Sequence, residues 1–304
     1  MSRAIQRAMF LILAVAMGAQ VEALERGSCT PVWDVAVGQP GVTGGLFPGV
    51  DALGIFDDGG GAALYVGGLY SSAGGVAVNN IAKWNGTGWS QLSVGVNEQV
   101  KALFVHDDGG GPALIVGGSF SQAGGAAANF IAKWNGASWS TLGTGMGFLV
   151  NALTEFNGEL YAGGLFLTAD GQSALRVASW DGTGWSPLSM GQFNGVNGPV
   201  NALAATENAS AIGPALYVGG NFSTATTIGA SNIAKWDGSS WSGLGSGVNA
   251  NVQTAAIFDD GGGEALYIGG GFVTAGGSTV NYIAKWNGSS WSGLGGGMND
   301  VVQD

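Results

Sequence analysis

The stretch Lys83-Trp84-Asn85-Gly86-Thr87-Gly88-Trp89-Ser90-Gln91-Leu92 decides the fold, because its two tryptophans return four more times along the 304-residue chain. The later pairs are Trp134 with Trp139, Trp180 with Trp185, Trp236 with Trp241, and Trp286 with Trp291. The first tryptophans of consecutive pairs are separated by 50, 46, 56 and 50 residues. A near-constant period in this range indicates a repeat architecture, in which one structural unit is copied.

Each unit is predicted to contain four short β-strands. In the first unit we expect them at residues 50–56, 63–68, 81–84 and 89–92. The turn sequences Asp57-Asp58-Gly59-Gly60-Gly61 and Asn85-Gly86-Thr87-Gly88 separate the strands, because Asp, Asn and Gly favour tight turns. The differences in repeat length fall in turns and loops, and no apolar pattern with a helical period occurs after the N-terminal region. The sequence therefore predicts an all-β chain.

A four-stranded sheet of about 50 residues cannot bury both faces alone, and a radial stack that closes on itself supplies neighbours on each side. We therefore predict a β-propeller of four-stranded blades, with five complete repeats between residues 50 and 298. Trp33-Asp34-Val35-Ala36-Val37-Gly38 looks like a lone fourth strand, and Val301-Val302-Gln303 looks like the start of a further first strand. Five or six blades are compatible with this pattern, as is a piece of a longer repeat protein.

The N-terminus has the features of a secretion signal. Two arginines, Arg3 and Arg7, precede an apolar run at residues 9–19, and Val21-Glu22-Ala23 has small residues where a signal peptidase reads. We expect cleavage after Ala23, so residues 1–23 form the signal peptide, 24–49 an N-terminal segment and 50–304 the propeller repeats. This division predicts a secreted protein, extracellular or at the cell surface, without membrane insertion after cleavage.

The composition argues against several classes of function. The net charge is −11 and only 10% of residues are charged, so the surface repels phosphate backbones and nucleic acid is not an expected partner. The chain has one cysteine, Cys29, and one histidine, His106, which leaves too few ligands for a zinc or copper site. We expect no metal and no cofactor.

The order of an apolar strand, a double glycine, a turn and Trp-x-x-Leu resembles the kelch repeat of galactose-oxidase-like propellers. Leu64-Tyr65-Val66-Gly67-Gly68 matches the strand with its double glycine, and Trp89 with Leu92 matches the Trp-x-x-Leu. The pattern is also similar to repeats of the fungal cortical cell-polarity marker family and of large secreted bacterial proteins. The resemblance, over about residues 30–304, implies a propeller fold and most often protein binding. The copper oxidase activity of some kelch relatives is not implied, because the histidines it needs are missing.

Recurrent polar residues have simple structural explanations. The pairs Asp57-Asp58, Asp107-Asp108 and Asp259-Asp260 lack the alternating spacing of calcium loops and are interpreted as turns, with weak calcium binding as the alternative. Lysines precede the first tryptophan in four repeats, which favours packing of each stem along an indole over a ligand-binding ring. His106 stands where other repeats have phenylalanine, so we interpret it as a variant strand end.

Candidate binding residues lie where the copies differ. In four-stranded blades, the long loops between second and third strands share one face with the connections between blades; we name this the loop face, and the opposite side the turn face. Non-repeated aromatic or charged residues are predicted on the loop face, and they form the ligand-binding candidates: Tyr70, Phe130, Arg176, Phe193 and Tyr282.

Two functional hypotheses follow. The first is a secreted, non-catalytic repeat protein that binds a protein or glycan partner through the loop face, or that serves as a structural module of a surface assembly. The alternative is a polysaccharide-acting hydrolase or lyase that uses carboxylates in the central channel. The polar residues of the first strands discriminate between them, because an enzyme needs two carboxylates at one rim: Asp51, Lys101, Asn151, Glu155, Asn201 and Glu207.

Overall fold

The computed structural model describes residues 41–44, 49–207 and 212–303. The predicted signal peptide and the strand-like segment at Trp33 lie outside the described residues. Within the described part, all regular structure is β, as the sequence predicts.

Five antiparallel four-stranded sheets follow one another along the chain, and each has its strands in sequence order from the centre outward. The first sheet contains β2 (Gly49–Asp57), β3 (Ala62–Leu69), β6 (Ile81–Trp84) and β7 (Trp89–Gln91). The second contains β8 (Val100–His106), β9 (Ala113–Gly118), β12 (Ile131–Trp134) and β13 (Trp139–Ser140). The third contains β14 (Val150–Phe156), β15 (Glu159–Gly164), β18 (Val177–Trp180) and β19 (Trp185–Pro187).

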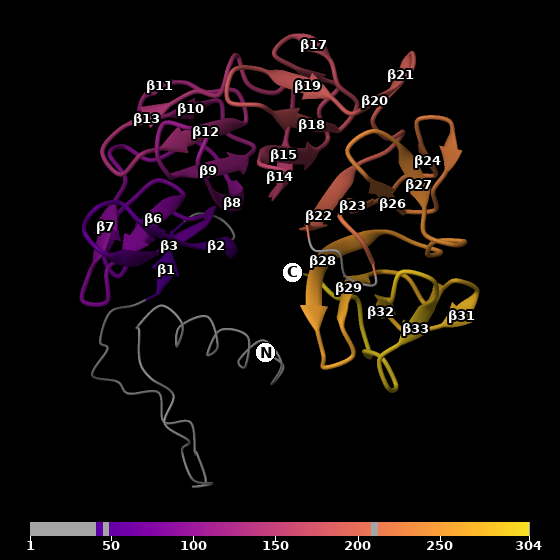
Figure 1. Ribbon diagram of the computed structural model, residues 1–304. Coiled ribbons are helices and arrows are strands. Elements are labelled where there is room, and N and C mark those ends of the chain that lie inside the picture. Colours follow the sequence, from indigo (N-terminus) through magenta and orange to yellow (C-terminus); the bar gives the residue numbers. More distant parts are fainter. Residues whose placement is uncertain (1–40, 45–48, 208–211, 304) are drawn as a thin grey trace, which may run out of the picture.

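The fourth sheet contains β22 (Val200–Thr206), β23 (Ala215–Gly220), β26 (Ile233–Trp236) and β27 (Trp241–Gly243). The fifth contains β28 (Val252–Asp259), β29 (Glu264–Gly270), β32 (Ile283–Trp286) and β33 (Trp291–Gly293). The sheets stand side by side around a common centre, with their first strands innermost (Figure 1). This arrangement is propeller-like, as predicted; the number of blades and the closure of the ring stay predictions.

The long loop between second and third strands carries a short hairpin in every repeat. The paired segments are β4 (Ser72–Ala73) with β5 (Val76–Ala77), β10 (Gln122–Ala123) with β11 (Ala126–Ala127), β16 (Thr168–Ala169) with β17 (Gln172–Ser173), β24 (Thr224–Ala225) with β25 (Ile228–Gly229), and β30 (Thr274–Ala275) with β31 (Ser278–Thr279). Two further short pairings involve β1 (Val42–Thr43), which joins β4, and β20 (Ser189–Met190) with β21 (Phe193–Asn194). The connection from each sheet to the next pairs with the following hairpin, for example Val96 with Ala123, so both belong to the loop face.

The tryptophans of each pair face each other directly across the hairpin between the third and fourth strands. Their ring centroids are 5.2 to 5.5 Å apart in all five sheets, within the range of favourable aromatic packing. The second indole also reaches the preceding sheet: Trp139 Nε1 donates to the Leu92 carbonyl oxygen at 3.0 Å, and the next three sheets repeat the bond. The repeated tryptophan therefore joins neighbouring sheets.

The double glycine at the end of each second strand allows two close approaches. A Cβ atom on Gly117 would lie 2.6 Å from Val150 Cγ1 of the next sheet, and a Cβ on Gly118 would lie 2.1 Å from the Gln99 carbonyl oxygen of its own sheet. Both distances are far inside van der Waals contact. The first glycine therefore lets sheets pack together, and the second lets the innermost strand lie close to its neighbour.

Four hydrophobic clusters fill the four junctions between consecutive sheets. At each junction, one sheet presents residues that point toward the next sheet, which we name its trailing face. The next sheet presents its leading face. In the first junction the trailing face contributes Phe56, Tyr65 and Ile81, and the leading face contributes Val100 and Leu114, all of them buried. Burial of such side chains is worth about 1.5–3 kcal/mol each, so the junctions hold the fold together.

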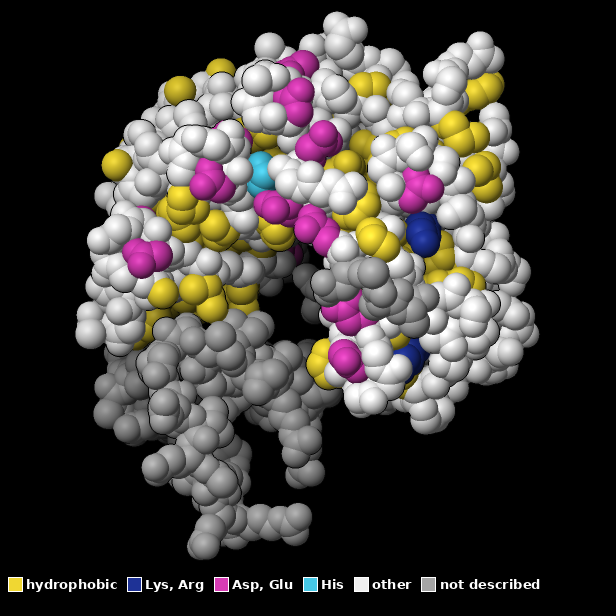
Figure 2. Space-filling view, in the orientation of Figure 1, with side chains coloured by type: hydrophobic (Ala, Val, Ile, Leu, Met, Phe, Trp, Pro, Cys, Tyr) yellow, Lys and Arg dark blue, Asp and Glu magenta, His cyan; other side chains and the backbone are white. Residues whose placement is uncertain are grey.

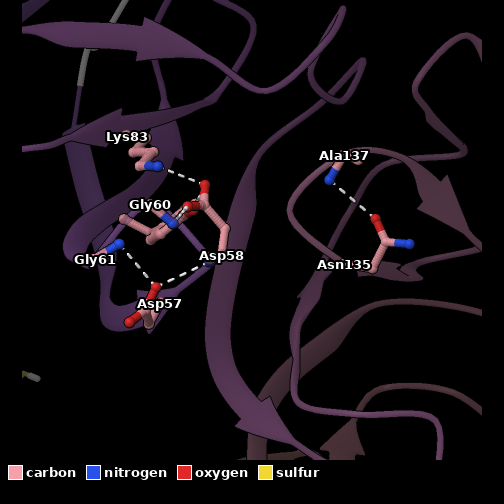
Figure 3. Close-up of polar contacts among 9 residues, drawn as sticks. Asp57, Asp58, Gly60, Gly61, Lys83, Asn135 and Ala137 are labelled. Atoms are coloured by element: carbon pink, nitrogen blue, oxygen red, sulfur yellow. Dashed lines mark hydrogen bonds and ion pairs between the residues drawn. The ribbon is translucent and has the colours of Figure 1, made fainter.

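The aspartate-rich segments form turns, as the sequence predicts. Asp57 Oδ1 accepts the amides of Gly59 and Gly61 at 2.9 Å, and Asp58 pairs with Lys83 from the third strand (Figure 3). The second sheet repeats the ion pair as Asp108 with Lys133, and the fifth as Asp260 with Lys285. Three of the four lysine ammonium groups therefore lie on carboxylates, and two of these also lie over tyrosine rings. The fourth, Lys235, donates to the Ile212 carbonyl oxygen at 3.3 Å. The packing of the lysine stems along the indoles stays a prediction.

Neighbouring turns on the turn face contact one another. The turn after β12 is held by Asn135 Oδ1, which accepts the amide of Ala137 at 3.0 Å, and it lies beside the aspartate turn of the first sheet (Figure 3). A Cβ on Gly136 would lie 2.7 Å from Asp58 Cβ. Glycine at this position therefore lets the two turns pack.

We predict that Gly117→Ala destabilises the protein by about 1–3 kcal/mol, because the added methyl overpacks the junction with Val150. Combining it with Val150→Ala should cost less than the sum of the two single changes. Urea unfolding of the three variants measures this coupling, with Gly88→Ala as the control because no atom lies near its Cβ position. Strict additivity would contradict a direct contact across the junction.

We predict a loss of stability at acidic pH that depends on these turn ion pairs. Burial would raise the pKa of Asp108, but the hydrogen bond and charge of Lys133 hold it below its ordinary value of 3.8. The hydrogen bond from Lys285 lowers the pKa of Asp260 to about 2. A lowered carboxyl pKa contributes stability above the unfolded value, and this contribution disappears as pH falls through the folded one.

The free energy of unfolding should therefore fall between about pH 4 and pH 2. Lys133→Met should flatten this decline, because it removes the partner that lowers the pKa of Asp108. Urea unfolding at a series of pH values measures both proteins. Equal pH dependence in the two proteins would show that the pair does not contribute.

Candidate functional site

Every innermost strand contains a β-bulge directly after its first valine, where the register with the second strand shifts by one residue. Bulges leave a residue outside the ladder and redirect its side chain. The bulged residues are Asp51, Lys101, Asn151, Asn201 and Gln253. They come from five sheets but share one position of the repeat.

The five bulged residues meet at the centre of the molecule. Together with the two residues that follow each of them, they line a cavity of about 170 Å³ between the innermost strands. A second cavity of about 320 Å³ is lined by the five bulged residues and Gln303. Because the innermost strands begin on the loop face, this ring of polar side chains forms the mouth of a central channel; we name it the channel mouth.

Hydrogen bonds between sheets orient part of the channel mouth. Asn151 Nδ2 donates to the Val200 carbonyl oxygen at 2.9 Å, and Asn201 Nδ2 donates to the Val252 carbonyl oxygen at 3.2 Å. Gln99 Nε2 donates to Asp51 Oδ2 at 2.7 Å. Among the described residues, Lys101 has neither an ion-pair nor a hydrogen-bond partner, so its ammonium group can bind a ligand without breaking a contact.

The copies also differ in chemistry at the channel mouth. The preceding residue is valine in every repeat, and the residue two positions further on is leucine in four of the five. The bulged position itself is an acid, a base or an amide. Packing explains the constant neighbours, whereas the varied residues face the channel, so the variation changes the chemistry of the ring.

The five loop-face candidates differ in burial and in position. Tyr70 is only 2% exposed and donates its hydroxyl to the Val66 carbonyl oxygen. Its counterparts in the other repeats are four buried phenylalanines: Phe120, Phe166, Phe222 and Phe272. Tyr70 is therefore a core aromatic rather than a surface residue, because this position of the repeat fills the sheet interior.

Phe130, Arg176 and Tyr282 occupy one equivalent position, directly before the third strand, where φ is positive in every repeat. In the other two repeats the residue is Asn80 or Asn232, whose Nδ2 atoms donate to the carbonyl oxygens of Val96 and Val248 at 2.9 and 2.8 Å. Asparagine tolerates this backbone conformation, whereas a bulky aromatic residue is strained by it. The aromatic residues therefore stand where an asparagine would stabilise the fold better.

The remaining candidates are spread around the loop face. Arg176 Nη1 donates to the Val196 carbonyl oxygen at 3.0 Å, which holds its side chain on the connection between the third and fourth sheets. Phe193 projects from the β20–β21 hairpin of that same connection and is exposed. Phe130 and Tyr282 belong to the second and fifth sheets. The five predicted residues therefore do not form one compact site.

Sequence reasoning missed two exposed apolar residues of the loop face, Phe148 and Leu167. Phe148, 47% exposed, packs edge-on against Phe130 with ring centroids 5.7 Å apart. Leu167 is exposed on the next sheet, on a segment that pairs with the backbone flanking Phe148 through the Gly147 amide and the Thr168 carbonyl oxygen at 2.8 Å. Comparing copies position by position would have found both, since Glu98 and Ser121 stand there in the preceding repeat.

The candidate carboxylates lie at two different levels of the channel. Asp51 lies at the channel mouth, whereas Glu155 and Glu207 lie near the turn-face ends of their strands and line neither cavity. Glu155 Oε2 is 2.7 Å from Nδ1 of the buried His106, and Glu207 Oε1 accepts the Asn157 amide at 2.7 Å. Along the channel axis, Glu155 lies four strand residues beyond the level of Asp51, whose equivalent in the same strand is Asn151. Four residues of strand span about 13 Å, which exceeds the spacing of the two carboxyl groups of a glycosidase.

Acidic side chains are spread over the face seen in Figure 2, around a central hollow. The described residues contain no group of three histidine, cysteine, aspartate or glutamate side chains arranged for a metal ion. No described segment is a helix long and apolar enough to cross a bilayer.

Comparisons with known proteins address the fold. No protein-family model matches the chain, and no curated protein matches it. Among solved structures, the extracellular domain of a putative one-component system from B. thetaiotaomicron is similar, with a TM-score of 0.50 and 12% identity over 87% of this chain. The match spans 30% of that protein. A computationally designed protein, Ika8, matches with a TM-score of 0.38 and 15% identity, over 87% of this chain and 92% of its own.

The similarity to the extracellular domain supports a fold of repeated β-sheets and leaves the family open. The kelch resemblance stays a prediction, because no family model matches.

We predict that Phe130→Asn stabilises the protein by about 1 kcal/mol, because it relieves a positive φ and places an amide donor as in Asn80. Asn232→Phe, the reverse change at the equivalent position, should destabilise by a similar amount. Thermal unfolding of both variants measures the effect. A destabilised Phe130→Asn protein would mean that packing against Phe148 outweighs the backbone strain.

Proposed function

We propose that the protein is an extracellular, non-catalytic binding module that takes an uncharged glycan at the channel mouth. The observation that carries the proposal is the ring of five bulged, chemically varied polar residues around one cavity. The kelch-like repeats and the predicted signal support an extracellular setting. The extracellular domain from B. thetaiotaomicron has a similar fold, which is consistent with this setting.

The chemistry of the ring favours a neutral, hydroxyl-rich ligand. Three of the five bulged residues are amides, and each amide offers both donors and an acceptor, as sugar hydroxyls require. The charges of Asp51 and Lys101 are opposite, so the ring has no net charge to attract an ion. The exposed Phe148 and Leu167 add apolar surface on the same face, against which a sugar ring can pack.

A protein partner is the second candidate, supported by the same exposed apolar residues on the loop face. A hydrolase or lyase is less well supported. A glycosidase places two carboxyl groups roughly 5–9.5 Å apart around one sugar, and Asp51 has no such partner at the channel mouth.

We predict that the chain binds neutral polysaccharides on a glycan array and that Lys101→Ala combined with Gln253→Ala weakens binding about tenfold, since each lost hydrogen bond is worth roughly 0.5–1.5 kcal/mol. Neither side chain makes a hydrogen bond to the described residues, so the double variant should fold normally. Gln91→Ala, on an exposed outer strand, serves as the control.

Unchanged affinity in the double variant would place the ligand elsewhere. A preference for uronic-acid polymers over neutral ones would contradict the expected ligand class.

We also predict that the protein releases no reducing sugars from any polysaccharide it binds, either with its native sequence or as Glu155→Gln with Glu207→Gln. These carboxylates are the two remaining candidates for catalysis, and both already accept hydrogen bonds from His106 and Asn157. Hydrolysis by the native protein that disappears in the double variant would establish the enzymatic alternative.

A further inference from the structure

The first and fifth sheets each expose one side of an interface that occurs four times between the sheets of the described chain. On trailing faces, Phe56 is 3% exposed and its equivalent in the fifth sheet, Phe258, is 58% exposed. The same holds for Tyr267, Ile283 and Leu294, which are partly exposed where their counterparts in the other sheets are buried. Among the described residues, no sixth sheet covers this trailing face.

The leading face of the first sheet is open in part: Val66 and Ala82 are buried there in a cluster with Tyr70, whereas residues at other positions of this face are exposed. Val50 is 45% exposed, whereas its four equivalents at the internal junctions are fully buried. Leu53 is exposed, and Leu64 and Trp84 are partly exposed, at positions that pack onto a preceding sheet elsewhere. Within the part of the chain that the structure describes, the fifth sheet thus has a bare trailing face and the first sheet a partly bare leading face, and these match the two sides of the internal junctions.

Both borders already show contacts of the kind made at an internal junction. A Cβ on Gly269 would lie 2.5 Å from Val302 Cγ1, the contact that Gly219 makes with Val252 at the preceding junction. Val302 therefore sits where the first valine of a sixth innermost strand belongs. At the other border, Val42 pairs with Ala73 as Val96 pairs with Ala123, which is the place of a connection arriving from a preceding sheet.

Both borders face the same channel. Gln303 follows Val302 as Gln253 follows Val252, and it lines the same cavity of about 320 Å³ as Asp51 of the first sheet. The sixth and first positions of the ring therefore border one channel. Val302 and Gln303 already take the positions of the first residues of an innermost strand, so a unit that continues this strand fits the border better than a second copy of the chain does.

We propose that the bare trailing and leading faces bind one further four-stranded unit of the same repeat, which continues from Val302 and Gln303 and closes the ring. Its chemistry is that of the internal units: a valine-led innermost strand and leucines on the leading side, with phenylalanine and tyrosine on the trailing side. Binding of this unit covers Phe258 on one side and Val50 on the other. This inference is independent of what the channel mouth binds.

The test compares the full chain with the full chain extended after Gln303 by a copy of residues 254–298. Phe258→Ser should leave the melting temperature of the unextended chain unchanged, because the side chain is exposed. In the extended chain it should lower the melting temperature by roughly 10 °C, as Phe56→Ser should in both proteins. Amide hydrogen exchange of β2 should slow in the extended chain, since closure buries Val50.

A control separates docking from closure. In a second extension, the copies of Phe258 and Tyr267 in the added unit are replaced by serine, so that it docks on the fifth sheet but cannot cover the first. Exchange of β2 should then stay as fast as in the unextended chain.

The proposal is overturned if Phe258→Ser is harmless in the extended chain, or if protection of β2 requires two added repeats. It is also overturned if light scattering shows the unextended chain as a dimer that Phe258→Ser dissociates, because a second copy then covers these faces.

Discussion

The contact of one sheet with the next is the constraint on which the rest of the structure depends. Each sheet has a trailing and a leading face, and neither can be left in water at low cost. The first glycine of the double glycine lets the valine of the next sheet approach, and the second indole of the tryptophan pair bonds to the preceding sheet. Without these contacts, a sheet of short strands and many glycines has too little core to fold.

The same constraint determines where the protein can vary. Most residues that face a neighbouring sheet recur from repeat to repeat, and so does the aspartate or asparagine that holds the turn between the third and fourth strands. The residue at the bulge after the first valine neither packs against a neighbouring sheet nor holds a turn. It lies outside the ladder, and its side chain points to the central channel. Variation from Asp51 to Lys101 to Asn151 therefore changes the chemistry of the channel mouth at no cost to the packing.

Much of the fold was predictable because one pattern is repeated five times. The tryptophan spacing, the turn sequences and the location of length changes in loops led to the four-stranded units that the structure contains. Turn chemistry was also legible: Asp57 engages the glycine amides of its own turn. The contacts of the lysines were harder to predict, because sequence cannot show that Lys83 pairs with Asp58, which lies in a turn 25 residues away.

The site was harder to predict, since it depends on backbone register. A bulge cannot be recognised from Val-Asn-Ala or Val-Lys-Ala alone. The sequence therefore identified the polar residues of the first strands but did not predict that they form a ring. Tyr70 appeared distinctive by type, yet it fills a position where the other repeats bury phenylalanine. Phe148 was missed because its importance comes from packing against Phe130 on another loop.

The most direct measurement is the free energy of unfolding of chains that contain one to five successive sheets from the N-terminal side. If each sheet depends on its neighbours, a chain of residues 49–98 alone shows no cooperative unfolding, and stability then rises with every junction added. An isolated sheet that unfolds cooperatively, with a stability close to that of the whole chain, would contradict the account.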